Sequence, residues 1–216
     1  KYQKGRQSVW QYLRMTSIVN PHAEIIFVDP EGEKHHWTRV TERLPTKVES
    51  IKPHPHGIEL GQLQRMVSES NDLNLNHFLL NNFSGVTNRA RKELCQAAEL
   101  EGTRKMRAIK GDDIRNLLEA FQGERLVNGQ PAKLLKPPTN CLSPIEEILI
   151  KKGLSKTIDS RFVTTLTRVP CVTQGNPFQV EVGLIFGGSM AGDKPVEILR
   201  FAYRVPLMYQ QGGCLL

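Results

Sequence analysis

The sequence predicts an α+β protein built from three successive segments. Residues 1–50 combine one helical pattern with two short runs of β-branched and aromatic side chains. Residues 58–122 repeat apolar side chains at three- and four-residue spacing, which is typical of helices. Residues 137–216 again mix a helical pattern with runs that alternate apolar and polar side chains. Stretches rich in proline and glycine, 44–57 and 123–140, separate these segments and predict linkers.

Composition and charge then limit the class of protein. The 216 residues are 39% hydrophobic and 24% charged, which is close to an ordinary globular chain. With 29 Lys and Arg against 22 Asp and Glu, the net charge of +7 favours an anionic partner, without choosing among nucleic acid, nucleotide and membrane surface. No apolar stretch approaches the roughly 18–20 residues of a transmembrane helix, and the polar, basic start is unlike a signal peptide. Four widely spaced cysteines favour a reducing intracellular compartment.

The first segment is predicted to be one helix followed by a hairpin. The expected elements are a helix over 7–19, a strand over 23–28, a turn over 29–32 and a strand over 33–40. Asn20-Pro21 ends the helix because a residue before proline avoids the α region. An isolated hairpin is only marginally stable, so we expect this strand pair to be loosely held.

The middle segment is predicted to form a small domain of four short helices. Four apolar stripes indicate them: Leu60, Leu63, Met66 and Val67; Leu75, Phe78 and Leu79; Ala90, Leu94 and Ala97; Ile114, Leu117, Leu118 and Phe121. Asp112-Asp113 precedes the fourth stripe as a helix N-terminal signal. Short turns between the stripes favour a compact helical arrangement.

The last segment is predicted to be α+β by itself. The expected elements are a helix over 143–153 with Gly153 as its stop, and strands over 162–168, 178–186 and 196–203. The strand over 178–186 begins with an alternation of apolar and polar residues, which is typical of a half-exposed strand.

The strongest candidate site is a basic stretch in the helical segment. Between Ser84 and Lys110 there are seven basic and three acidic residues, a local net charge of +4. Ser84-Gly85-Val86 reads as a tight turn into a helix N-terminus, where backbone N–H groups can meet a phosphate. The predicted DNA-binding residues are Ser84, Arg89, Arg91, Lys92, Lys105 and Arg107. The alternative interpretation is a solvated helix face.

Other kinds of site lack their patterns in this sequence. His54-Pro55-His56 has diverging side chains and no neighbouring acidic or cysteine ligand, so we interpret it as a structural linker and expect no metal site. The nucleotide signatures GxGxxG and GxxxxGK[ST] are absent, and no cysteine stands in a nucleophile signature. We therefore predict no catalytic, cofactor-binding or metal-ligating residue within this chain.

Several long blocks resemble the B subunits of DNA topoisomerase VI, a family of type IIB topoisomerases. The blocks occur in the family's order over essentially the whole chain: 5–24, Phe27–Gly32, Ile51–Gly57, Pro137–Ile145, Asn176–Glu181 and Leu199–Gly212. Two features depart from the family pattern. Val86-Thr87 stands where the family often has Val-Gly, and the linker over Gly123–Leu135 is enlarged, as a lineage-specific hairpin would be.

The resemblance implies a domain layout and a role for the segment. Residues 1–50 would be the end of an ATPase domain of the gyrase, chaperone and histidine-kinase type, residues 57–136 a helix-two-turn-helix domain, and residues 137–216 the beginning of a transducer domain. The chain would be an internal segment that relays closure of an ATP-driven gate and contacts DNA. Its parent would relax supercoils and decatenate DNA by double-strand passage, with the ATP contacts and the cleavage tyrosine outside this segment.

The resemblance also implies cofactors, partners and location. ATP and Mg²⁺ would act in the full-length protein, and the partners would be double-stranded DNA, the A subunit and a second B subunit, with no membrane. The location would be the cytoplasm with the nucleoid in a prokaryote or the nucleus in a eukaryote. Two alternatives stay open: a non-catalytic scaffold partner of a DNA-cleaving subunit of the meiotic type, and a stand-alone DNA-binding module.

Overall fold

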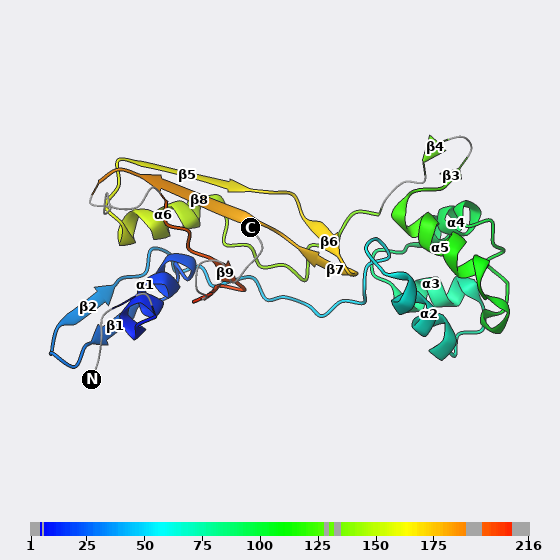
Figure 1. The fold of residues 1–216 in the computed structure, drawn as a ribbon, viewed down its shortest axis with the longest axis horizontal. Helices are drawn as coiled ribbons and strands as arrows, with labels where there is room; N and C mark the ends of the chain where they lie inside the picture. Colours follow the sequence, from blue (N-terminus) through cyan, green and yellow to red (C-terminus); the bar gives the residue numbers. More distant parts are fainter. Residues whose placement is uncertain (1–4, 6, 128–129, 132–134, 189–195, 209–216) are drawn as a thin grey trace. The chain divides into compact units, whose positions relative to one another are not determined.

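A computed structural model describes residues 5, 7–127, 130–131, 135–188 and 196–208 (Figure 1). The chain divides into two compact units, both assembled from distant parts of the sequence. One unit, here the α+β unit, comprises 1–47, 143–168 and 180–216. The other, here the helical unit, comprises 48–142 and 169–179. The mixture of helix and strand that the sequence predicts is confirmed. Among the described residues, no helix is both long enough and apolar enough to cross a membrane.

The helical unit contains the four predicted helices and two short hairpins. Its elements are α2 (Leu60–Glu69), α3 (Leu75–Asn82), α4 (Asn88–Ala97), the 3₁₀ turn η1 (Met106–Ala108), α5 (Asp112–Gln122), the antiparallel pair β3 (Leu126–Val127) and β4 (Gln130–Pro131), and the antiparallel pair β6 (Cys171–Thr173) and β7 (Asn176–Phe178). Asn74 and Thr87 begin α3 and α4 by accepting backbone N–H groups of those helices. Gly123 ends α5 in the left-handed conformation.

One apolar core holds these helices together, and the predicted stripes supply it. Each of the four helices contributes fully or nearly fully buried side chains, among them Leu63, Val67, Phe78, Leu79, Leu94, Leu117 and Phe121. Phe83, just after α3, packs edge-on against Phe78 and Phe121 with ring centroids 5.6 and 5.0 Å away. Such edge-to-face pairs add to the stabilisation from burial, so Phe83 ties α3 to α5.

The α+β unit joins the start of the chain to its end. Its elements are α1 (Val9–Val19), the antiparallel pair β1 (Ile25–Val28) and β2 (Lys34–Trp37), α6 (Glu147–Thr157), the antiparallel pair β5 (Phe162–Thr167) and β8 (Glu181–Phe186), and the short pair β9 (Phe201–Ala202) and β10 (Val205–Pro206). α6 packs against β5 and β8 on one side and against α1 on the other. The buried side chains of this contact are Ile18, Val19, Ile145, Ile150 and Leu154.

The predicted helix over 143–153 is displaced in the structure. α6 begins at Glu147 and continues to Thr157, so Gly153 lies inside the helix instead of ending it. The residues just before it are not helical: Glu146 has φ +78°, and the two carboxylate oxygens of Glu181 accept the backbone N–H groups of Ile145 and Glu146, at 2.7 and 2.8 Å. Gly153 serves helix packing, since a Cβ at this position would overlap the backbone of Ile18 in α1.

The strand predictions of the last segment are only partly right. The strand expected over 178–186 is interrupted, because β7 ends at Phe178 and β8 begins at Glu181. The hairpin of β6 and β7 was not predicted. Of the strand expected over 196–203, only Phe201–Ala202 pairs, and residues 189–195 lie outside the described chain. The enlarged linker contains a hairpin, β3 with β4.

Candidate nucleic-acid interface

The turn that precedes α4 has the shape that the sequence predicts. Gly85 adopts φ +73°, a left-handed conformation that favours glycine. Thr87, the residue that departs from the family pattern, is the N-cap of α4, and its hydroxyl accepts the N–H of Ala90 at 3.2 Å. A helix start has unpaired backbone N–H groups and the positive end of the helix dipole, which together favour an anion.

The basic residues of α4 differ in how far they are available to a ligand. The Arg89 side chain is 88% exposed, and its Nε donates to Glu93 Oε1 at 2.8 Å, which raises the pKa of Arg89. Arg91 is half-buried, and its Nε has no hydrogen-bond partner within the described chain. Lys92 is exposed. The helix start therefore carries three positive charges, of which one is already paired with a carboxylate.

Lys105 and Arg107 form a second, separate basic group. The N–H groups of Leu75 and Asn76, at the start of α3, donate to the carbonyls of Arg104 and Gly102 at 3.0 and 2.8 Å. The loop with Lys105 and Arg107 thus lies at the beginning of α3, whereas Ser84 follows its end. Eight helical residues span about 12 Å. The structure therefore places the six predicted residues in two groups, one near each end of α3.

Both members of the second group are exposed, Lys105 as the N-cap of η1 and Arg107 within it. Met106 and Ile109 are buried in the core of the helical unit and fix this turn, which leaves Lys105, just before it, and Arg107, within it, exposed. The neighbouring Arg104 is engaged, because its guanidinium donates to Asp113 Oδ1 at 2.9 Å and to the Ala108 carbonyl at 3.2 Å. The exposed charge of this loop therefore comes from Lys105, Arg107 and Lys110.

Sequence reasoning missed the residue that lies under the turn of Gly85. His54, interpreted above as part of a linker, is fully buried. Its Nε2 lies 3.2 Å from the Lys136 carbonyl, and its Nδ1 accepts the His56 N–H at 3.2 Å. Burial lowers the pKa of His54 below its ordinary value. The proline, histidine and glycine repeat in this stretch was the available signal, but a single sequence does not reveal which histidine is buried.

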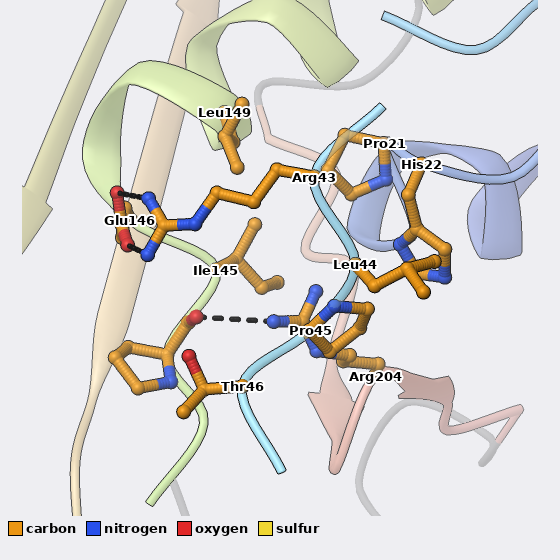
Figure 2. A pocket seen from close by; sticks show the side chains of 11 residues that line it. Pro21, His22, Arg43, Leu44, Pro45, Thr46, Ile145, Glu146, Leu149 and Arg204 are labelled. Atoms are coloured by element: carbon orange, nitrogen blue, oxygen red, sulfur yellow. Dashed lines mark hydrogen bonds and ion pairs between the residues drawn. The ribbon is translucent and has the colours of Figure 1, made fainter. Parts of the chain in front are cut away.

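A small pocket of the α+β unit brings two arginines together, but both are engaged (Figure 2). Arg43 makes a two-pronged ion pair with Glu146, with N–O distances of 2.7 and 3.1 Å. The Arg204 guanidinium donates to the carbonyls of Val19, Ser143 and Pro144 at 3.0 to 3.3 Å. Burial lowers the pKa of Arg204. These contacts give the pocket a role in joining chain segments.

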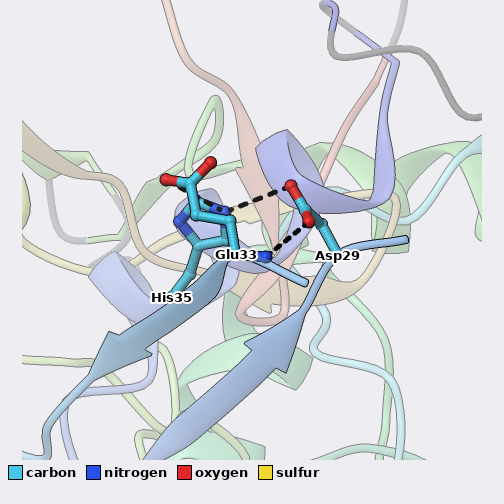
Figure 3. A group of neighbouring side chains, drawn as sticks. All are labelled: Asp29, Glu33 and His35. Atoms are coloured by element: carbon cyan, nitrogen blue, oxygen red, sulfur yellow. Dashed lines mark hydrogen bonds and ion pairs between the residues drawn. The ribbon is translucent and has the colours of Figure 1, made fainter. Parts of the chain in front are cut away.

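Asp29, Glu33 and His35 gather at the hairpin of β1 and β2 (Figure 3). One oxygen or nitrogen of each lies within 4.8 Å of the others. Asp29 Oδ1 accepts the N–H groups of Glu31 and Glu33 at 3.0 and 2.9 Å, so this carboxylate closes the hairpin turn. His35 stacks with Phe27 and Trp37, with ring centroids 6.0 Å apart in each case. The hairpin's own structure thus accounts for the cluster.

Comparisons with known proteins show what the chain resembles. The family described as topoisomerase VI B subunit, transducer, matches residues 137–216. The chain is 45% identical over 215 residues to the B subunit of type 2 DNA topoisomerase 6 from Methanosarcina acetivorans, and 44% identical over 214 residues to that from Methanococcoides burtonii. It is 31% identical over 210 residues to the corresponding protein of Saccharolobus islandicus. These alignments cover 96–99% of this chain but 33–38% of the relatives, so the chain spans about a third of their length. Over nearly its whole length the chain is therefore similar to part of the B subunits of DNA topoisomerase VI, and residues 137–216 match the transducer of that family.

Proposed function

We propose that this chain is the part of a topoisomerase VI B subunit that contacts duplex DNA and relays movement between domains. The observation that carries the DNA contact is the start of α4. There, a left-handed glycine turn leads into a capped helix whose first five residues include Arg89, Arg91 and Lys92. A phosphate at this point would meet backbone N–H groups and side-chain charge together.

The proposal includes the layout and partners of the whole protein. Residues 1–50 would end an ATPase domain, residues 57–136 would form the helix-two-turn-helix domain, and residues 137–216 would begin the transducer. The whole protein would dimerise through its ATPase domain, use ATP and Mg²⁺, and act with an A subunit that cuts DNA. It would relax supercoils and decatenate DNA by passing one duplex through another. The names of the relatives, each a B subunit of type 2 DNA topoisomerase 6, support this assignment.

The two basic groups of the helical unit suit the backbone of a duplex. The start of α4 and the η1 loop lie at opposite ends of α3, about 12 Å apart along its axis. This separation is close to the width of the major groove, so the two groups could reach phosphates on its two sides. Contacts to phosphates position a protein but carry no sequence information. The proposed binding is therefore independent of DNA sequence.

A salt titration of duplex binding tests the proposal. We expect three to five neutralised phosphates, and hence a slope of log K against log salt of about −3 to −5. Replacing Arg89, Arg91 and Lys92 together by Ala should lower the affinity and flatten the slope by about 2–3. The matched control replaces Lys151 and Lys152, two exposed lysines of α6, by Ala. Fluorescence anisotropy with a labelled duplex of mixed sequence measures both.

The comparison of these two variants decides the outcome. The proposal requires that the α4 variant lose far more affinity than the α6 variant. Equal losses would mean that the overall positive charge of the chain attracts DNA, without a particular role for α4. Unchanged affinity in both variants would remove the start of α4 from the DNA contact.

We further propose that the nucleotide contacts of the whole protein come from residues outside this chain. The absence of a glycine-rich phosphate-binding pattern in the sequence supports this. A ligand that binds only the folded state raises its apparent stability. We therefore expect the melting temperature of the chain to be the same with and without Mg²⁺-ATP, and a concentration-dependent rise would contradict this part of the proposal.

A further inference from the structure

Four chain segments meet at Pro53 and His54 in the helical unit. The His54 N–H donates to the carbonyl of Gly175 in the turn between β6 and β7, at 2.7 Å. The Pro53 carbonyl accepts the N–H of Ser84 at 3.0 Å. In the His54 side chain, Nε2 lies 3.2 Å from the Lys136 carbonyl oxygen. The start of α4, the β6–β7 turn and the chain after the enlarged linker therefore share one point of attachment.

Gly85 lies directly over the imidazole of His54. A Cβ placed on Gly85 would come 3.8 Å from Cδ2 and Nε2 of the ring and 3.8 Å from the Lys136 carbonyl oxygen. These are ordinary contact distances, so the ring and the carbonyl together form the floor beneath the turn. A bond between Nε2 and the Lys136 carbonyl is needed to hold this floor, because an unpaired polar atom buried at this point would be costly.

The two ring partners of His54 select one neutral tautomer. A backbone N–H, that of His56, points at Nδ1, which must therefore accept. The carbonyl of Lys136 can only accept, so Nε2 must carry the hydrogen. With a side chain that is 0% exposed, no solvent competes for these bonds. A protonated ring would place two N–H groups against each other at Nδ1.

We propose that His54 is the positioning residue of the DNA contact: its bond to the Lys136 carbonyl holds the Ser84-Gly85 turn in the geometry that aims the start of α4 at a phosphate. The part of this inference that concerns DNA binding rests on the proposed function, whereas the geometry of the turn can be measured without DNA. It goes beyond the basic residues, because His54 itself is buried and acts through the turn above it.

Two substitutions of similar size distinguish two roles of the His54 side chain: holding the turn through a hydrogen bond, and filling space in the core. His54→Gln keeps an N–H near the place of Nε2, whereas His54→Leu fills the space without a donor. We expect the Gln variant to bind the labelled duplex within about twofold of the original chain. The Leu variant should bind about tenfold more weakly, because a displaced α4 start would lose one charge-assisted hydrogen bond to a phosphate. Equal affinity of the two variants would overturn the positioning role.

Hydrogen exchange at the Ser84 amide provides the readout without DNA. We expect its protection to survive in His54→Gln and to fall in His54→Leu, while amides inside α5 stay protected in both. Equal Ser84 protection in both variants overturns the inference whether or not DNA binds. Failure of the original chain to bind duplex, with the exchange difference present, rejects the proposed function and leaves His54 as the residue that positions the turn.

The unaltered chain gives a further check in case the Leu variant does not fold. Nitrogen NMR of the histidine rings reports which ring nitrogen of His54 carries hydrogen. The inference requires hydrogen on Nε2 and none on Nδ1, together with a shift of this ring signal and of the Ser84 amide when the duplex is added. Hydrogen on Nδ1 would exclude the bond to Lys136 and overturn the inference.

Discussion

Gly153 in α6 lies directly against the backbone of Ile18 in α1, so close that a Cβ on Gly153 would overlap the Ile18 carbonyl oxygen. A glycine inside a helix costs about 1 kcal/mol relative to alanine. At this crossing the cost is offset by the close approach of two helices, whose contact includes Ile18, Ile150 and Leu154. We expect Gly153→Ala to lower the free energy of unfolding of the α+β unit by about 1–3 kcal/mol, because the helices must separate. Urea unfolding measures it.

Gly61 is the matched control for this substitution. It lies in the first turn of α2, has an ordinary φ, and a Cβ there would meet nothing within 4 Å. Gly61→Ala should leave the stability unchanged or raise it by about 0.5 kcal/mol, through the better helix propensity of alanine. If both alanine variants were equally stable, the close crossing of α1 and α6 would be wrong.

We expect the Arg204 side chain to contribute more to the stability of the α+β unit than exposed side chains of the same unit do. Its guanidinium bonds three carbonyls, and its own carbonyl accepts the side-chain amide of Asn20 at 3.0 Å. Arg204→Met should cost about 2–3 kcal/mol because the carbonyls lose a charged donor. Arg204→Lys should restore little, since an ammonium lacks the planar fork. Lys152→Met, at an exposed site, is the control, and a loss as large as that of Arg204→Met would contradict the prediction.

The stability of the helical unit should fall when the pH drops below about 6.5, the ordinary pKa of histidine. Burial lowers the pKa of His54, and the titratable group facing its ring is His56. The unfolded chain therefore takes up a proton on His54 before the folded chain does. Unfolding free energy then declines by up to about 1.4 kcal/mol per pH unit between the unfolded and the folded pKa. His54→Gln should remove this part of the pH dependence, and an identical profile in the variant would refute the assignment to His54.

The hairpin of β1 and β2 should exchange its amide hydrogens faster than the helical unit. It is a sheet of two strands, and Ile26 and Val28 on its outer face are 55% and 57% exposed. Local opening there breaks few apolar contacts, whereas opening α5 exposes Leu117 and Phe121. Exchange followed by mass spectrometry compares the two regions. Protection of the hairpin equal to that of α5 would contradict this expectation.

The local pattern of the sequence was sufficient for the four helices of the helical unit and for the turn before α4. Spacing of apolar residues predicted α2 to α5, because a helix that buries one face must repeat its apolar residues every three or four positions. The turn at Gly85 and the start of α4 were also predicted, since glycine in the left-handed region and a following helix are local properties. The same reasoning predicted that Lys105 and Arg107 share one site with Ser84. The local sequence pattern could not reveal that the two groups lie near opposite ends of α3.

The tertiary structure decided what depends on contacts between distant residues. Gly153 has the local pattern of a helix stop, yet it lies within α6 because Ile18, 135 positions earlier in the sequence, needs the space of its missing side chain. His54 has the local pattern of a linker, yet it is buried because Ser84, Lys136 and Gly175 supply its surroundings. The sequence alone determined which segments become helices and where the positive charge lies. Packing determined which glycine and which histidine hold those segments in place, since burial and hydrogen bonding are satisfied only when remote parts of the chain meet.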